Sequence, residues 1–164
     1  MNSSGVGAKR RPATESEEEE HRRVLTTTGI QEAIIEAATD ARNCALAQYS
    51  KFCVGAALEA EDGTIYTGCN IESSAYELTM CAERVTIWKA LSEGARKFKR
   101  IAVVADTERL TPPCGACRQI IWEFCGDVPV VLANLRGDTE TLQMSFLLPR
   151  PFDADFLDET AGEK

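Results

Sequence analysis

The chain has 164 residues, a formal net charge of −8, and 44% hydrophobic and 27% charged residues, which are the proportions of one soluble globular domain. No apolar stretch approaches the roughly 20 residues of a membrane span, and the first residues lack the apolar block of a secretory signal. We therefore expect a cytoplasmic protein without a membrane partner. The excess negative charge lies beyond residue 30, where 21 acidic residues face 13 basic ones, and it disfavours a nucleic-acid partner because it repels phosphate backbones.

The first 27 residues are polar, with a Lys9-Arg10-Arg11 triplet and the acidic run 17–20. The triplet is compatible with an arm for an acidic partner. We favour a solvated, disordered tail, because its Gly, Ser and Glu residues offer nothing to bury. The predicted organisation is therefore this tail, one catalytic domain over 28–158, and a short C-terminal tail over 159–164.

The ordered part begins with an amphipathic pattern. Apolar residues recur at intervals of three and four from Thr28 and predict a helix that ends near Ala47. Two apolar-rich runs follow, and they predict a hairpin because Glu61-Asp62-Gly63 separates them. These strands span 54–59 and 64–69.

The second half of the chain alternates helices with buried strands. A helix is predicted from Cys81 to a stop at Gly94, and another over 114–124. Continuous apolar runs at 101–105 and 128–133 are typical of strands covered on both faces. The order αββαβαβ, with a short C-terminal helix, indicates an α/β fold in which helices flank a mostly parallel or mixed sheet.

Two cysteine-containing fragments each open a predicted helix: Cys81-Ala82-Glu83 and Pro113-Cys114-Gly115-Ala116-Cys117. The free N–H groups and positive dipole of a helix N-terminus favour thiolate. Cys114 and Cys117 share one helix face, and Cys81 on a second helix completes a three-thiolate zinc site with its fourth position open, as in catalytic zinc sites.

The residues beside these ligands suggest supporting roles. Glu83 lies two residues after Cys81, where a general acid/base can reach a metal-bound water without being a ligand. Zinc with three thiolates carries a net charge of −1. Arg84 and Arg118 each follow a ligand motif, and we expect both to donate hydrogen bonds to the sulfurs.

Together the two fragments form the zinc-deaminase signature. The sequence resembles the small, homotetrameric, zinc-dependent cytidine deaminases of the cytidine/deoxycytidylate deaminase superfamily. The likeness covers roughly two thirds of the chain, in family order. It rests on Tyr49-Ser50-Lys51-Phe52, Val54-Gly55-Ala56-Ala57, Gly68-Cys69-Asn70-Ile71-Glu72, Cys81-Ala82-Glu83-Arg84, Pro113 to Gln119 and Leu147-Leu148-Pro149. The chain departs from the usual family residues at Gln48, Ser73 and Trp88.

The resemblance implies a three-layer α-β-α sandwich around a five-stranded mixed sheet, one Zn²⁺ per subunit, and a homotetramer. It implies hydrolysis of cytidine and 2′-deoxycytidine to uridine and 2′-deoxyuridine with release of ammonia, by zinc-activated water and a glutamate proton shuttle, in pyrimidine salvage. It further implies that Asn70 and Glu72 hold the ribose hydroxyls, that Phe52 packs against the nucleoside, and that backbone near Ala82 and Glu83 reads the base. Tyr76 and Phe152 would line a neighbouring subunit's site.

Plainer interpretations accompany these assignments. The three ligand cysteines also suit a structural or redox role, Glu83 suits a first-turn helix acid, and Asn70 and Glu72 suit turn and surface positions. The remaining cysteines and both tryptophans are expected to pack in the core, the tryptophans alternatively at an interface: Cys44, Cys53, Cys69, Cys125, Trp88 and Trp122. The single histidine, His21, lies in the tail and excludes a histidine ligand or a Ser-His hydrolase.

Four functions compete. The leading one is deamination of free cytidine and deoxycytidine. The second keeps the chemistry on a modified cytosine nucleoside or a blasticidin-type antibiotic. Polynucleotide editing is opposed by the negative charge. A non-catalytic zinc module would need a fourth thiol, such as Cys53 or Cys69, to close the site.

Overall fold

The computed structural model describes residue 29, residues 31–154 and residues 156–157. The chain divides into two units, Met1–Ile30 and Gln31–Lys164, and the fold below is that of the second. The predicted tails, 1–27 and 159–164, lie outside the described residues, as do the two end residues of the predicted domain.

Five strands form one mixed sheet. After a helix over residues 31–42, the elements are β1 (Val54–Ala60), β2 (Ile65–Cys69), the 3₁₀ turn η1 (Tyr76–Leu78), α2 (Ala82–Ser92), β3 (Phe98–Ala105), α3 (Gly115–Cys125), β4 (Pro129–Asn134), β5 (Thr139–Gln143) and α4 (Met144–Leu147). The strand order is β2-β1-β3-β4-β5, with β3 and β4 parallel and the other neighbours antiparallel. The five-stranded mixed sheet implied by the resemblance is confirmed.

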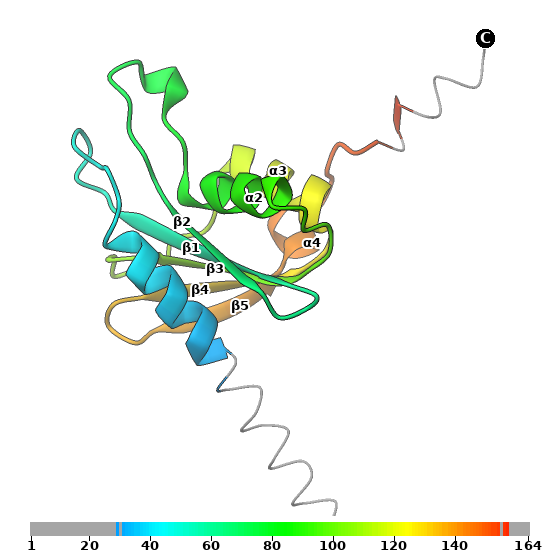
Figure 1. The fold of residues 1–164 in the computed structure, drawn as a ribbon, viewed down its shortest axis with the longest axis horizontal. Helices are drawn as coiled ribbons and strands as arrows, with labels where there is room; N and C mark the ends of the chain where they lie inside the picture. The colour runs from blue at the N-terminus through cyan, green and yellow to red at the C-terminus, as the bar shows by residue number, and fades with distance from the viewer. Residues whose placement is uncertain (1–28, 30, 155, 158–164) are drawn as a thin grey trace, which may run out of the picture. The chain divides into compact units, whose positions relative to one another are not determined.

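Helices cover both faces of this sheet. The helix over 31–42 lies on one face, and α2, α3 and α4 lie on the other (Figure 1). Because neighbouring residues of a strand point to opposite faces, β3 divides its side chains between two cores. Ile101 and Val103 pack under α2 and α3, whereas Ala102 and Val104 pack against the 31–42 helix. The three-layer α-β-α arrangement is thus confirmed.

Two details differ from the pattern-based prediction. The first helix ends at residue 42 and does not reach Ala47. Beyond it, Leu46 runs alongside Ile71: its N–H donates to Asn70 O at 3.0 Å, and its carbonyl accepts from Glu72 N at 2.9 Å. Strand pairing therefore replaces helical hydrogen bonds there. The hydrophobic pattern does not predict strand β5, because β5 is a polar edge strand with four of its five residues exposed.

Glycine lets the first helix approach the sheet closely. A Cβ on Gly55 would lie 1.9 Å from Ala38 O and 2.5 Å from Arg42 N. On the opposite face, a Cβ on Gly68 would lie 2.7 Å from Thr86 Oγ1. Backbone therefore packs on backbone at Gly55, and this contact sets the separation of the 31–42 helix from β1.

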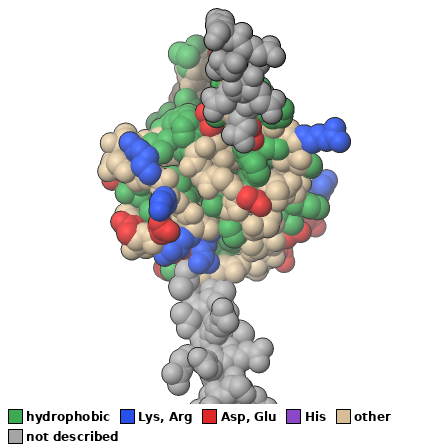
Figure 2. Space-filling model, turned by 90° about the vertical axis from the view of Figure 1, so that its right-hand side faces the viewer, with side chains coloured by type: hydrophobic (Ala, Val, Ile, Leu, Met, Phe, Trp, Pro, Cys, Tyr) green, Lys and Arg blue, Asp and Glu red, His purple; other side chains and the backbone are tan. Residues whose placement is uncertain are grey.

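The surface carries both signs of charge. On the face that Figure 2 presents, basic and acidic side chains are interspersed with hydrophobic ones. None of the helices in the described part has the length and apolarity needed to cross a bilayer.

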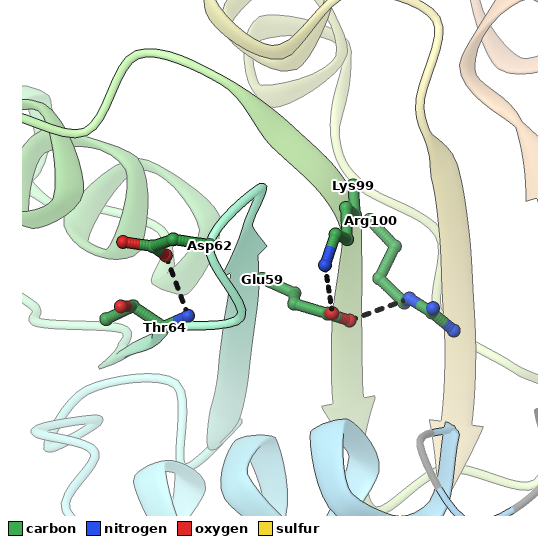
Figure 3. Close-up of polar contacts among 5 residues, drawn as sticks. All are labelled: Glu59, Asp62, Thr64, Lys99 and Arg100. Atoms are coloured by element: carbon green, nitrogen blue, oxygen red, sulfur yellow. Dashed lines mark hydrogen bonds and ion pairs between the residues drawn. The ribbon is translucent and has the colours of Figure 1, made fainter. Parts of the chain in front are cut away.

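One carboxylate is buried among the strands. Glu59, on β1, is 7% exposed, and its oxygens lie 3.4 Å from Lys99 Nζ and 2.9 Å from Arg100 Nε on β3 (Figure 3). A buried charge needs such partners, because desolvation penalises it heavily.

In the β1–β2 turn, Asp62 Oδ1 accepts from Thr64 N at 2.9 Å, which lowers the pKa of Asp62 (Figure 3). The predicted hairpin is confirmed.

The topology gathers several chain segments at one edge of the sheet. β3 and β4 are parallel and β1 runs against β3, so the carboxyl ends of β2, β3 and β4 and the start of β1 lie at the same edge. The connections that lead to α2 and α3 leave from this edge. In open α/β sheets, such an edge is where ligands bind.

The close approach at Gly55 makes a testable prediction. Gly55→Ala forces a methyl group into the 31–42 helix backbone and should lower the free energy of unfolding by about 3 kcal/mol. Urea unfolding followed by circular dichroism measures the loss. Gly115→Ala is the matched control, because its Cβ meets nothing within 4 Å, and it should change stability by less than about 1 kcal/mol. Equal unfolding midpoints for the two variants would contradict the backbone contact.

Candidate metal centre and active site

Two helix N-termini present cysteines at the edge of the sheet. Cys81 is the N-cap of α2 and Cys114 is the N-cap of α3, both in extended backbone conformation. Neither side chain makes a capping hydrogen bond, so both sulfurs are available for another partner. The positive ends of the two helix dipoles favour thiolate at these positions.

The predicted ligands come together. The Sγ atoms of Cys81, Cys114 and Cys117 lie within 4.8 Å of one another, and those of Cys81 and Cys114 are 3.9 Å apart. Zn–S bonds of about 2.3 Å in a tetrahedral site place sulfurs about 3.8 Å apart, so the donor set fits zinc. Within the described residues, this is the one group of three or more metal-ligating side chains so arranged.

The electrostatics of the cluster favour an anion on Cys81. Hydrogen bonds from the Cys117 thiol and from Arg84 lower the pKa of Cys81 to about 5. The same contact between the two cysteines, together with burial, raises the pKa of Cys117. Arg84 Nη2 lies 3.8 Å from Cys81 Sγ and also donates to Thr79 O at 3.2 Å. Arg84 is therefore placed to compensate thiolate charge.

Glu83 is buried beside the sulfurs. It is 4% exposed, in the first turn of α2, and burial, reinforced by the charge of Cys81, raises its pKa to about 7. A carboxyl group that exchanges its proton near neutral pH is suited to general acid/base work. Its position next to Cys81 is the one expected of a non-ligand proton carrier.

The expectation that Arg118 also donates to the sulfurs is wrong. Its Nε donates to Pro113 O at 2.8 Å and its Nη1 to Leu147 O at 2.9 Å. The guanidinium ties the turn before Cys114 to the end of α4. Arg118 thus fixes where α3 begins and supports the ligands through the backbone.

Asn70 and Glu72 both hold the segment that precedes β1. Asn70 Oδ1 accepts from Val54 N and Asn70 Nδ2 donates to Phe52 O, each at 2.8 Å, and the residue is 8% exposed. The Glu72 carboxylate accepts from Tyr49 N at 2.7 Å and from Ser50 N and Oγ, and the Ser50 bond lowers its pKa. Both residues therefore act as backbone anchors, and neither is a freely exposed surface residue, since Asn70 is buried and Glu72 is half-buried.

The other expected substrate contacts occupy different settings. Ala82 is fully buried, and the N–H groups of the first turn of α2 have no intrahelical acceptor; that of Glu83 donates to its own carboxylate. Phe52, Tyr76 and Phe152 are 42%, 74% and 59% exposed. Tyr76 meets Tyr49 edge-on at 5.7 Å, and Phe152 stacks on Phe156 at 5.7 Å.

The remaining cysteines do not all pack in the core. Cys44 is exposed, so its expected burial is wrong: the helix ends before it, and no apolar layer covers it. Cys53, Cys69 and Cys125 are half-buried, and burial raises the pKa of Cys125 to about 12. Cys69 pairs with Gly55 and so shares the sheet face of the 31–42 helix, opposite α2 and α3. A fourth thiolate from Cys69 is therefore out of position.

The two tryptophans lie on the outer helices. Trp88 is 38% exposed and meets Phe124 edge-on at 5.2 Å. Trp122 is half-buried against the α2–α3 core. Trp122 thus agrees with a core position, and Trp88 retains a surface that a neighbour can cover.

Ser50 was not singled out from the sequence. Its hydroxyl donates to Glu72 and accepts from Phe52 N at 3.0 Å. A signal was present, because Ser often bonds the backbone two residues ahead in a turn. Without the register between this segment and Glu72, nothing pointed to the second bond.

Comparisons with known proteins agree with this geometry. The sequence profile of the cytidine and deoxycytidylate deaminase zinc-binding region matches residues 28–133. A cytidine deaminase of Sporosarcina psychrophila is 56% identical over 133 residues, which cover 80% of this chain and 98% of that protein. A cytidine deaminase of Halalkalibacterium halodurans is 48% identical over 130 residues, covering 79% and 98%. The crystal structure of a cytidine deaminase from Burkholderia pseudomallei matches with a TM-score of 0.72 and 46% identity, over 74% of this chain and 98% of that one.

The ligand assignment predicts the effect of single substitutions. Cys114→Ser should lose bound zinc, because a hydroxyl is a poor zinc ligand near neutral pH. Cys125→Ser, which changes a half-buried thiol outside the cluster, should keep it. Metal analysis of the purified proteins by mass spectrometry measures the stoichiometry. One zinc per chain in Cys114→Ser would remove Cys114 from the ligand set.

Proposed function

The chain belongs to the cytidine and deoxycytidylate deaminase family, and on that premise we propose that it hydrolyses cytidine and 2′-deoxycytidine to uridine and 2′-deoxyuridine with release of ammonia. It is a zinc-dependent hydrolase. The observation that carries the proposal is the convergence of three cysteine sulfurs and one buried carboxyl group, Glu83, at the N-termini of α2 and α3.

Different residues would bind the metal and transfer the protons. Cys81, Cys114 and Cys117 hold the zinc, which supplies Lewis-acid activation of water when bound. Glu83 would take one proton from the attacking water and pass it to N3 of the cytosine. It would then take the second proton from the new hydroxyl at C4 and pass it to the amine, which leaves as ammonia while C4 becomes a carbonyl. The pKa of Glu83, about 7, lets it accept and release that proton near neutral pH.

Contacts to the substrate come from the same edge. We propose that Phe52 packs against the nucleoside, that Asn70 and Glu72 bind the ribose hydroxyls, and that the N–H groups of the first turn of α2, at Ala82 and Glu83, read the base. In Asn70, Oδ1 accepts from Val54 N and one N–H of Nδ2 donates to Phe52 O, so the second N–H of Nδ2 remains for a ligand. That remaining N–H group can donate to a ribose hydroxyl.

The alternatives are less well supported. The relatives at 56% and 48% identity are both named cytidine deaminase, which favours an unmodified cytosine nucleoside over a modified one or an antibiotic. A non-catalytic zinc module would leave the buried Glu83 without a role. Polynucleotide editing is opposed by the net charge of −8.

The setting of the enzyme follows from its chemistry. We propose that the catalytic domain spans 28–158 and acts in the salvage of pyrimidine nucleosides. We also propose a cytoplasmic location, because all seven cysteines are free and the three ligands must stay reduced.

Several large apolar side chains are exposed in the single chain. Leu78 is 71% exposed and Phe146 is 70% exposed, besides Tyr76 and Phe152. Solvent exposure of so many large apolar groups favours an interface. We propose a homotetramer in which Tyr76 and Phe152 line the site of a neighbouring subunit.

The catalytic role of Glu83 is tested by Glu83→Gln. The amide preserves the shape but cannot carry the proton, so turnover of cytidine should fall roughly 10² to 10⁴-fold while zinc is retained. Ammonia release from cytidine by zinc-loaded protein measures both forms. Turnover within about tenfold of the unsubstituted protein would rule out the proton shuttle, and no ammonia release from the unsubstituted protein would refute the function.

The assembly is tested in solution. Light scattering should give four times the mass of one chain, since dihedral tetramers of self-complementary subunits are common among such assemblies. Removal of the chain from Pro149 onward, which takes Phe152 away, should lower activity and leave zinc bound. A fully active monomer would contradict both the tetramer and the roles of Tyr76 and Phe152.

A further inference from the structure

Ser50 lies in a turn whose backbone is strained. Lys51 has φ of 60°, and it is the one non-glycine residue with positive φ among the described residues. Such a conformation persists only where its surroundings impose it. Here Lys51 N donates to Ala47 O at 3.0 Å and Lys51 Nζ donates to Gln48 O at 2.7 Å. The turn directs Phe52 N back toward Ser50 Oγ.

The hydroxyl of Ser50 joins two groups that are far apart in the sequence. It accepts a hydrogen bond from Phe52 N at 3.0 Å and donates its own proton to Glu72 Oε1. The other carboxylate oxygen of Glu72 accepts from Ser50 N at 3.1 Å and Tyr49 N at 2.7 Å. The Glu72 carboxylate and the Phe52 N–H group therefore share the Ser50 hydroxyl as a hydrogen-bond partner.

The same backbone unit is held from its other side. Phe52 O accepts from Asn70 Nδ2 at 2.8 Å. The backbone of Phe52 is thus fixed at its N–H by Ser50 and at its carbonyl by Asn70. Loss of the Ser50 bond would leave Phe52 anchored at its carbonyl alone.

Hydrogen bonds connect this clamp to the metal centre. Ile71, between Asn70 and Glu72, exchanges two backbone bonds of 2.9 Å with Met80, and Met80 directly precedes Cys81. The segment 49–54 is therefore linked, through residues 70–72, to the backbone that leads directly into a zinc ligand. Phe52 and Glu72 are the residues proposed above to contact the nucleoside.

We propose that Ser50 is a positioning residue that sets the affinity for the nucleoside, because its hydroxyl locks the Glu72 carboxylate and the Phe52 backbone into one arrangement. The proposal rests on the proposed function for its substrate, a cytosine nucleoside. Ser50 does not touch the reacting atoms. Its removal should therefore weaken binding and leave the chemical step intact.

The test compares three variants of the full-length, zinc-loaded protein. Ser50→Ala should raise KM for cytidine roughly tenfold, with kcat within about twofold, because a hydrogen bond to a carboxylate is lost. Ser50→Thr keeps the hydroxyl and should recover KM to within about threefold. Ser92→Ala is the matched control: Ser92 is an exposed serine whose hydroxyl donates to Lys89 O at 2.8 Å, at the far end of α2, and its loss should change neither constant.

A second readout does not depend on catalysis. Hydrogen exchange of the Phe52 amide, followed by NMR, should accelerate in Ser50→Ala and not in Ser92→Ala, since the Phe52 N–H loses its acceptor only in the former. A KM within twofold of the unsubstituted value in Ser50→Ala overturns the proposal, as does a tenfold loss of kcat at constant KM. If the unsubstituted protein does not turn over cytidine, the proposed function fails, whereas unchanged Phe52 exchange in Ser50→Ala refutes the clamp itself.

Discussion

Three cysteine sulfurs within 4.8 Å of one another form a donor set whose members must be held at a single point of the structure. Two of those sulfurs belong to N-cap residues, where the positive ends of α2 and α3 meet them, and Arg84 adds a cation at 3.8 Å. The helices can only begin side by side because the sheet returns both of their preceding segments to the same edge. The strand order and the parallel pairing of β3 with β4 thus determine where α2 and α3 begin, and the helix starts in turn determine where the cysteines lie.

The local and the long-range parts of this arrangement were not equally predictable. The two cysteine fragments carry their own signal, because a helix start, a thiol and a nearby carboxylate are adjacent in sequence. The buried strands were also predictable from apolar runs such as 101–105. In contrast, the end of the first helix depends on Leu46 pairing with the residues around Ile71, and no local pattern reveals a partner that is 25 positions away. The polar strand β5 is defined by its pairing with β4 and has no hydrophobic pattern of its own.

The predictions for Arg118 and Cys44 are wrong for the same physical reason: the surroundings of both residues depend on the fold and not on their sequence neighbours. Sequence proximity to Cys117 suggested that Arg118 reaches the sulfurs, but its guanidinium instead bonds Leu147 O, whose place depends on the fold of α4 against α3. Cys44 follows an apolar helix face and yet is exposed, because the helix ends two residues before it. Similarly, the roles of Asn70 and Glu72 as backbone anchors follow from the register of two segments, and the resemblance alone described only their contacts with a ligand.

The polar edge strand has a consequence for how copies of the chain can meet. Within the described residues, the outer backbone groups of β5 pair with no other strand, and such an edge invites another strand to continue the sheet. Its exposed residues, Thr139, Glu140, Thr141 and Gln143, are all polar, so a strand added at this edge would bury little apolar surface. Growth of the sheet into an open-ended fibre is thereby discouraged. Contacts between copies are left to the apolar side chains of the helices and loops, which can be covered in a closed assembly.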